Sequence, residues 1–239
     1  MIERGKPAEY GQEIIRRRLR LTRGYVALAG RHILDFGCGN GAQTIELVSP
    51  DSLIVAVDID LNDLGILADQ LRTRKIGSVL PVQYDGEHIP VASASINVAV
   101  SFEVLEHVRD EAIVLREIHR VLAPSGEFVL TVPNKGWLFE THGAHLPLLP
   151  WNRVPMFSWL PKSLHERYAK ARIYRRKDIV RLLTSLGFDV LETQYVTAPM
   201  DVVTQPWLKR ILRTIIFRGD TTRVTFLATA ILVHCRKRA

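Results

Sequence analysis

Apolar and polar positions change their spacing along the chain in a regular way. From residue 31 onwards, short runs of β-branched and aliphatic side chains alternate with segments whose apolar positions recur every three or four residues. The first pattern indicates buried strands and the second amphipathic helices, so their alternation predicts βαβ units and a parallel sheet. The predicted strands are residues 32–36, 53–58, 78–83, 96–101, 127–132, 189–197 and 224–235. The predicted helices are residues 42–48, 61–74, 110–122 and 176–186.

The segment before the first predicted strand, residues 8–23, has the pattern of one amphipathic helix. Its apolar stripe consists of Tyr10, Ile14, Ile15 and Leu19. Its basic face consists of Arg16, Arg17, Arg18 and Arg20. We expect these arginines to face solvent.

Residues 133–175 break the alternation, since they contain repeated prolines and three tryptophans without a clear strand. This pattern indicates an insertion after the fifth strand, where it would lie beside the ligand crevice of an open α/β sheet. We therefore expect a substrate lid there. We treat residues 1–239 as one domain: an N-terminal helical segment 1–30, a core 31–134, a substrate-side insertion 135–175 and a C-terminal part of the sheet 176–239.

Composition narrows the class of protein. With 47% hydrophobic and 24% charged residues, the chain fits neither a disordered protein nor a multi-span membrane protein. The formal net charge of +7 favours an anionic partner, which leaves open a nucleic acid, an acidic substrate or a membrane surface. The spacing of Cys38 and Cys235 indicates neither a disulfide framework nor a zinc site. The N-terminus lacks the apolar stretch of a signal peptide, so we expect a cytoplasmic location.

A glycine-rich turn follows the first predicted strand. Asp35 closes the strand, and Gly37, Gly39 and Gly41 precede the next helix. Glycines let the backbone approach a ligand closely, and the helix start offers N–H donors. Dinucleotide-binding enzymes have a related turn, but their fingerprint is Gly-x-Gly-x-x-Gly, whereas the spacing here is Gly-x-Gly-x-Gly.

Acidic residues also follow the second and third predicted strands. Asp58 ends one strand, where a carboxylate can accept both hydroxyls of a ribose. Asp85 follows the next, where it can accept a bond from an adenine amino group while Ile89 covers the ring. Three acids at the ends of neighbouring strands predict a nucleoside site.

Together these motifs resemble the cofactor-binding core of class I S-adenosylmethionine (SAM)-dependent methyltransferases, over about residues 31–134. The resemblance is greatest to the small-molecule group that includes ubiquinone-biosynthesis O-methyltransferases. Residues 101–108, from the end of the fourth predicted strand onwards, form a further motif of this resemblance. It implies a Rossmann-like seven-stranded sheet with helices on both faces and an inserted, antiparallel last strand. It also implies that Asp35 and the glycines lie near the methionine part of SAM, Asp58 on the ribose, Asp85 beside adenine, and Ser101 and Phe102 on the sulfonium side. The complete set of expected cofactor residues is Asp35, Gly37, Cys38, Gly39, Gly41, Asp58, Ile59, Asp85, Gly86, Ser101 and Phe102.

Methyl transfer from a sulfonium needs an aligned nucleophile and sometimes a base that removes its proton. Our candidate bases are His107, after the fourth strand, and His142 in the insertion, with His145 nearby. A structural role explains a lone histidine equally well. Residues 103–107 also match a Glu-x-x-Glu-His pattern that resembles the divalent-metal site of some O-methyltransferases, so a metal stays open.

The sequence defines the methyl acceptor less clearly than the cofactor. Basic residues predominate between residues 153 and 181, among interleaved aromatic side chains, which suits an amphiphilic acceptor with negative charge or an anionic membrane. A satellite core under a solvated basic face is the alternative. Residues 205–217 predict a basic amphipathic helix that lies either on a membrane or on its own domain. We expect methylation of a small or lipid-like metabolite at oxygen; the alternatives are an RNA methyltransferase and a catalytically inactive SAM-binding accessory protein.

Overall fold

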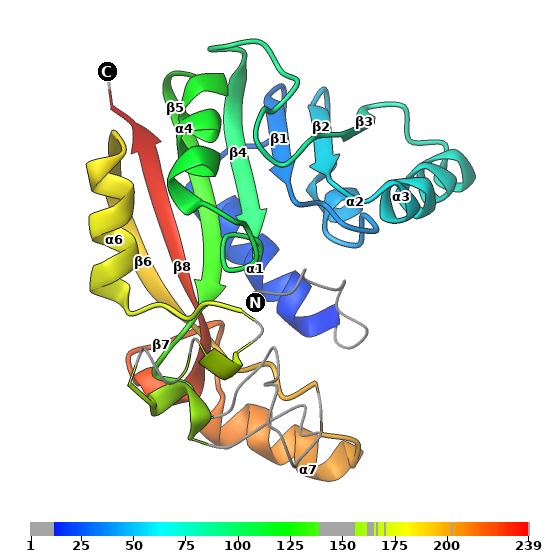
Figure 1. Cartoon of the computed structure of the whole chain (residues 1–239). Coiled ribbons are helices and arrows are strands. Elements are labelled where there is room, and N and C mark those ends of the chain that lie inside the picture. Colours follow the sequence, from blue (N-terminus) through cyan, green and yellow to red (C-terminus); the bar gives the residue numbers. More distant parts are fainter. Residues whose placement is uncertain are drawn as a thin grey trace.

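The computed structural model describes residues 12–138, 156–161, 165, 167–169, 171–201 and 203–238. Within them, eight strands form one mixed sheet in the order β3-β2-β1-β4-β5-β8-β6-β7 (Figure 1). Their bounds are β1 His32–Phe36, β2 Leu53–Asp58, β3 Val79–Gln83, β4 Ile96–Phe102, β5 Leu122–Pro133, β6 Phe188–Thr197, β7 Thr221–Thr222 and β8 Ala228–Lys237.

The sheet confirms the predicted topology. Strands β1 to β5 pair in parallel, and β8 pairs antiparallel with both β5 and β6. The eighth strand is β7, a two-residue strand at the edge that is too short to produce a periodic pattern. The last strand begins at Ala228 rather than residue 224, because Thr225–Leu227 form a 3-10 turn. In β5 the pairing with β4 passes from Leu122 directly to Glu127, so residues 124–126 lie outside the ladder.

The helices are α1 Gln12–Tyr25, α2 Thr44–Leu47, α3 Leu61–Arg74, α4 Glu111–Val121, α6 Arg176–Ser185 and α7 Pro206–Ile211. Aspartates begin two of them. The carboxylate of Asp60 accepts bonds from the first N–H groups of α3, and that of Asp110 does the same for α4. Helix α7 continues into a π-helical turn, Leu212–Ile216, so the predicted helix 205–217 is present in two parts.

Alternate residues of the strands pack into two separate hydrophobic cores, one on each face of the sheet. Leu34 and Phe36 pack on the face that α4 and α6 cover, together with residues such as Leu115. Ile33 lies on the opposite face, where α1, α2 and α3 contribute apolar side chains such as Leu67. Figure 1 shows α4 and α6 in front of the sheet and α1 behind it. The fold is therefore a three-layer α/β domain.

The arginines of α1 correct one expectation, since Arg17 and Arg18 are buried rather than solvated. Arg17 donates from Nη1 to the carbonyl oxygens of Thr197 at 2.8 Å and Ala198 at 3.2 Å. Arg20 forms an ion pair with Asp220 at 2.6 Å. These partners lie about two hundred residues away in sequence, so helical periodicity alone did not reveal them.

Candidate functional site

The carboxyl ends of β1, β2 and β4 meet at one edge of the sheet, the lower edge in Figure 1. The register places Asp35 between Ala56 of β2 and Val100 of β4. The loop after β1, the end of β2 and the end of β4 are consequently neighbours. This is the edge where the cofactor residues were expected.

The glycine turn is closely packed on both sides. Gly37 has a φ of +76°, and a Cβ atom there would lie 2.3 Å from Cγ2 of Val104, in the loop after β4. Gly41 has a φ of +83°, and its Cβ would lie 2.2 Å from Cδ1 of Leu67 in α3. A side chain at either position would both strain the backbone and collide with a neighbour, so the turn requires glycine.

Two carboxylates organise this turn. Asp35 is 2% exposed and accepts a hydrogen bond of 2.7 Å from Oγ1 of Thr44. Its burial raises the pKa of Asp35 to about 6; the Thr44 bond opposes this rise and the charge of Asp58 adds to it. The Asp58 carboxylate accepts bonds from the backbone N–H of Gly39 at 2.8 Å and of Asp60 at 3.0 Å. Asp58 thereby joins the turn to the end of β2.

Cys38 lies in the same turn with a buried side chain. Burial, with the neighbouring charges of Asp35 and Asp58, raises the pKa of its thiol. The thiol is therefore neutral and contributes a small apolar surface to the turn.

The third acid is placed differently. Asp85 is an exposed residue, and its carboxylate accepts bonds from the backbone N–H groups of Glu87 at 2.8 Å and His88 at 2.7 Å, which lower its pKa. Gly86 beside it has a φ of +93°. The expectation that Ile89 covers an adenine ring is wrong, because its side chain is only 2% exposed and lies in the core. Ile59, after β2, is an exposed apolar side chain at this edge, as is Leu61 at the start of α3.

The end of β4 carries Ser101 and Phe102, both buried, and then Glu103 with a φ of +58°. This conformation is uncommon for glutamate and is found most often at functional positions. The Glu103 carboxylate lies 3.3 Å from Nη2 of Arg18 in α1. Burial raises the pKa of Glu103, while the Arg18 charge opposes that rise.

Arg18 is a site residue that the sequence prediction missed. One signal was present: Arg18 is spaced four residues from both Ile14 and Thr22, on the apolar stripe of α1 rather than opposite it. A charged residue on a buried stripe indicates a buried partner. Here that partner is Glu103.

His107 lies in the same loop, and Nε2 of its largely buried ring is 3.9 Å from Oε1 of Glu106. Burial raises the pKa of the Glu106 carboxyl well above its ordinary value, and the charge of Glu103 adds to this rise. Arg172 fixes the following residues by donating to the carbonyls of Val108 at 2.6 Å and Arg109 at 2.9 Å.

Within the described part of the chain, no cluster of three or more histidine, cysteine, aspartate or glutamate side chains has a metal-binding arrangement. The Glu-x-x-Glu-His pattern at residues 103–107 therefore does not form such a cluster. His142 and His145 lie outside the described residues.

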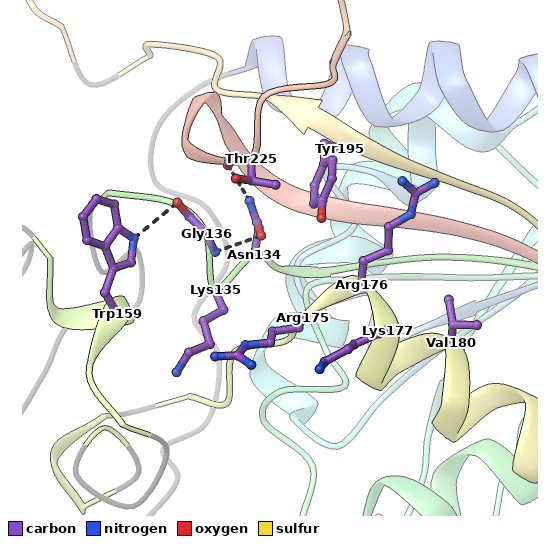
Figure 2. A pocket seen from close by; sticks show the side chains of 10 residues that line it. All are labelled: Asn134, Lys135, Gly136, Trp159, Arg175, Arg176, Lys177, Val180, Tyr195 and Thr225. Atoms are coloured by element: carbon purple, nitrogen blue, oxygen red, sulfur yellow. Dashed lines mark hydrogen bonds between the residues drawn. The ribbon is translucent and has the colours of Figure 1, made fainter.

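A cavity of about 650 Å³ opens beyond β5, and we call it the basic cavity (Figure 2). Its walls come from the residues after β5, the start of α6 and the end of β6, and include Lys135, Trp159, Arg175 and Tyr195. Trp159 is 48% exposed, whereas Trp137 is buried in a small separate core with Phe217. The aromatic residues near the insertion thus divide between an open cavity wall and a satellite core.

Comparisons with known proteins agree with this geometry. Residues 8–193 match a family model described as a methyltransferase domain. The chain is 26% identical over 194 residues to a probable S-adenosylmethionine-dependent methyltransferase of Mycolicibacterium smegmatis, covering 77% of this chain and 70% of that protein. It is 28% identical over 192 residues to the ubiquinone biosynthesis O-methyltransferase of Nitrosococcus oceani, covering 74% and 76% of the two chains. The fold matches a solved SAM-dependent methyltransferase from Aquifex aeolicus with a TM-score of 0.61, at 12% identity over 92% of this chain and 89% of that one.

Proposed function

The chain belongs to the class I SAM-dependent methyltransferases, and within that family we propose that it methylates a small or lipid-like metabolite at an oxygen atom. The observation that carries the proposal is the similarity to an O-methyltransferase over 74% of this chain. The glycine turn, the acids after β1 and β2 and the loop after β4 all lie within residues 8–193, which match the methyltransferase family model.

The geometry of the turn after β1 supports its assignment to SAM. Gly37 and Gly41, both with positive φ, let the backbone turn sharply while Val104 and Leu67 pack directly against it, which fixes the course of the turn. When bound, SAM supplies a methyl group activated by its sulfonium. We assign Asp35 to the amino group of the methionine part, Asp58 to the ribose hydroxyls, and Asp85 with Ile59 to the adenine. The remaining assigned positions, Cys38, Gly39, Gly86, Ser101 and Phe102, complete the walls of this site.

We assign His107 to removal of the proton from the acceptor hydroxyl. His107 lies in the loop after β4, which also carries Val104, the residue packed against Gly37. Arg172 holds the residues after His107 in place. An imidazole can accept a proton near neutral pH and so increases the nucleophilicity of an oxygen. His107→Ala should preserve SAM affinity while slowing transfer.

A lipid-like acceptor would bring the enzyme to a membrane, and the surface of α7 and of the π-helical turn after it supports such contact. Trp207, Ile211 and Ile215 are spaced four residues apart and are exposed, with Trp207 at 65% and Ile215 at 72%. Lys209 and Arg210 lie between them in sequence and can attract anionic lipid. No helix in the described part of the chain combines the length and apolar character needed to span a bilayer.

The test uses SAM carrying a ¹³C-methyl group, with isothermal titration of SAM and S-adenosylhomocysteine as the binding measurement. The enzyme is incubated separately with aqueous metabolites, solvent-extracted lipids and RNA from cells. We expect both ligands to bind and the label to enter a small or solvent-extractable product with the ¹³C shift of an O-methyl group. Label in RNA would favour the nucleic-acid alternative, and binding without transfer to any fraction would favour an inactive accessory protein.

A further inference from the structure

The basic cavity has an unusual charge balance. Four cationic side chains line it, Lys135, Arg175, Arg176 and Lys177, and no carboxylate does. Figure 2 shows Lys135, Arg175 and Lys177 extending toward the same side of the cavity, whereas Arg176 extends toward Tyr195. Like charges gathered around one space create a positive potential that favours an anion.

Contacts with carbonyl oxygens orient two of these four groups. Arg176 donates from Nη2 to the carbonyl of Thr193 at 2.6 Å, and its guanidinium carbon lies 5.6 Å from the centre of the Tyr195 ring. Lys135 donates from Nζ to the carbonyl of Leu160 at 2.9 Å. Carbonyl oxygens orient these groups but carry no net charge, so the positive charge of the cavity is not neutralised by them.

Nearby acids do not cancel the charge either. An adjacent cavity of about 550 Å³ shares Lys135, Trp159 and Arg175 with the basic cavity and contains Glu111 and Asp178. Glu111 is already engaged, since it accepts a 2.6 Å bond from Tyr174 and lies 3.8 Å from Nε of Arg172. Among the described residues that line these two cavities, Asp178 is the remaining carboxylate near the four cations of the basic cavity.

The size and walls of the basic cavity suit a small organic molecule. Its volume of about 650 Å³ lies in the range of small-molecule sites, roughly 300–1,000 Å³. Trp159 and Tyr195 provide aromatic walls, and the Trp159 indole is held by a bond of 3.3 Å to the carbonyl of Gly136. A flat apolar group could lie against these rings while an attached anion reaches the cations.

The position of the cavity connects it with methyl transfer. Asn134 and Lys135 directly follow β5, which pairs with β4 up to Phe102 and Thr131. The loop after β4 begins with a bond of 3.0 Å from Glu103 N–H to the Thr131 carbonyl and continues to His107. The cavity thus begins at the strand end next to the one that carries the assigned base.

We propose that the basic cavity binds a carboxylate or phosphate of the methyl acceptor, so that the acceptor is an anionic molecule with an aromatic or other flat apolar body. This inference rests on the proposed function, because it places the acceptor of that reaction. Arg175 and Lys177 provide the main charge contacts, and Trp159 provides the apolar wall.

The test measures binding to the full chain saturated with S-adenosylhomocysteine, using benzoate, phenyl phosphate and the uncharged analogue benzyl alcohol. Isothermal titration should show one or both anions binding at least about tenfold more tightly than benzyl alcohol, the ratio expected for one charge-assisted contact. Arg175→Gln and Lys177→Gln should each remove most of this preference. Arg181→Gln, an exposed arginine on the same helix that does not line the cavity, is the matched control.

The outcomes separate the two proposals. Failure of S-adenosylhomocysteine to bind would contradict the cofactor site and with it the proposed function. Normal S-adenosylhomocysteine affinity with equal affinity for all three probes would overturn the anion site alone. The same holds if Arg181→Gln weakens anion binding as much as Arg175→Gln does. Unchanged affinity for S-adenosylhomocysteine in every variant shows that each variant is folded.

Discussion

The two halves of the sheet edge are built by different means. In the half proposed to bind the cofactor, at the ends of β1 to β4, the side chains of Asp35 and Asp58 are buried and hydrogen-bonded to neighbouring elements, as with Asp58 and the N–H of Gly39. In the acceptor half, from β5 onwards, aromatic side chains such as Trp159 and Trp207 are exposed and cations outnumber acids. The first half therefore tolerates few substitutions, and the second can change its surface without loss of the fold.

The largest effect is expected in the glycine turn. Gly37→Ala forces a side chain into a φ of +76° and places Cβ 2.3 Å from Val104, which should destabilise the protein by about 3–5 kcal/mol. SAM binding should be lost with it. Urea unfolding and isothermal titration measure both. The control is Gly65→Ala in α3, where a Cβ meets nothing within 4 Å; it should stabilise the helix by about 0.5–1 kcal/mol. Equal stability of the two variants would contradict the packing argument.

The next effect depends on pH and concerns Asp35. Its folded-state pKa of about 6 lies above the ordinary value of 3.8, so the folded protein binds this proton more tightly than the unfolded chain does. The stability associated with that proton is present at low pH and is lost as pH rises through about 6. Asp35→Asn keeps an acceptor for Thr44 but removes the buried charge. It should therefore be more stable than the parent by roughly 2–3 kcal/mol at pH 8.

Urea titrations of both proteins between pH 4 and pH 8 check this prediction. The difference between them should shrink steadily toward pH 4, where Asp35 is protonated in the folded protein and becomes partly protonated in the unfolded chain. Glu103 and Glu106 also titrate, but they are common to both proteins and cancel in the difference. A stability gap that is constant with pH would show that the buried charge is not its cause. In the same experiment, SAM should bind the Asn variant more weakly, since the charge assigned to the methionine amino group is gone.

Asp58→Ala should have the third-largest effect, a loss of about 30-fold in SAM affinity, or roughly 2 kcal/mol. The carboxylate holds Gly39 and Asp60 and is assigned to the ribose hydroxyls. Asp58→Asn retains one acceptor oxygen and should lose less. Titration calorimetry with SAM compares the two variants, and near-normal affinity in Asp58→Ala would refute the ribose assignment.

The contrast between the halves also explains what the sequence could predict. The turn and the strand ends that carry the proposed cofactor residues could be predicted because Asp35 and the glycines after it are close in sequence and each further acid follows a predicted strand, so local spacing carries the information. Arg17 was misjudged because its partners, the carbonyls of Thr197 and Ala198, are distant in sequence. Ile89 was misjudged because an apolar side chain near a strand end can enter the core as readily as the ligand site.

The basic cavity illustrates the same limit on the acceptor side. Its walls come from five separate segments, represented by Lys135, Trp159, Arg175, Tyr195 and Thr225. The excess of basic residues was visible in the sequence, but charge counting cannot show which cations share one space. The long-range pairing of β8 between β5 and β6 determines that arrangement.

The smallest effect on stability is expected for the exposed side chains of α7 and of the π-helical turn that follows it. This prediction tests most directly the contrast between the two halves of the sheet edge. Trp207 and Ile215 are exposed, so Trp207→Ser and Ile215→Ser should change the free energy of unfolding by no more than about 0.5 kcal/mol. Leu212→Ser, between them, removes a side chain packed against Trp137 and Phe217 and should destabilise by about 2 kcal/mol. Sedimentation with vesicles containing anionic phospholipid should then fall for the first two variants, because they remove only the apolar surface assigned to lipid. If both variants sediment with vesicles as the parent does, this exposed surface does not bind membranes. If both variants are as unstable as Leu212→Ser, the surface is part of the core, and the contrast between the two halves of the sheet edge fails at this segment.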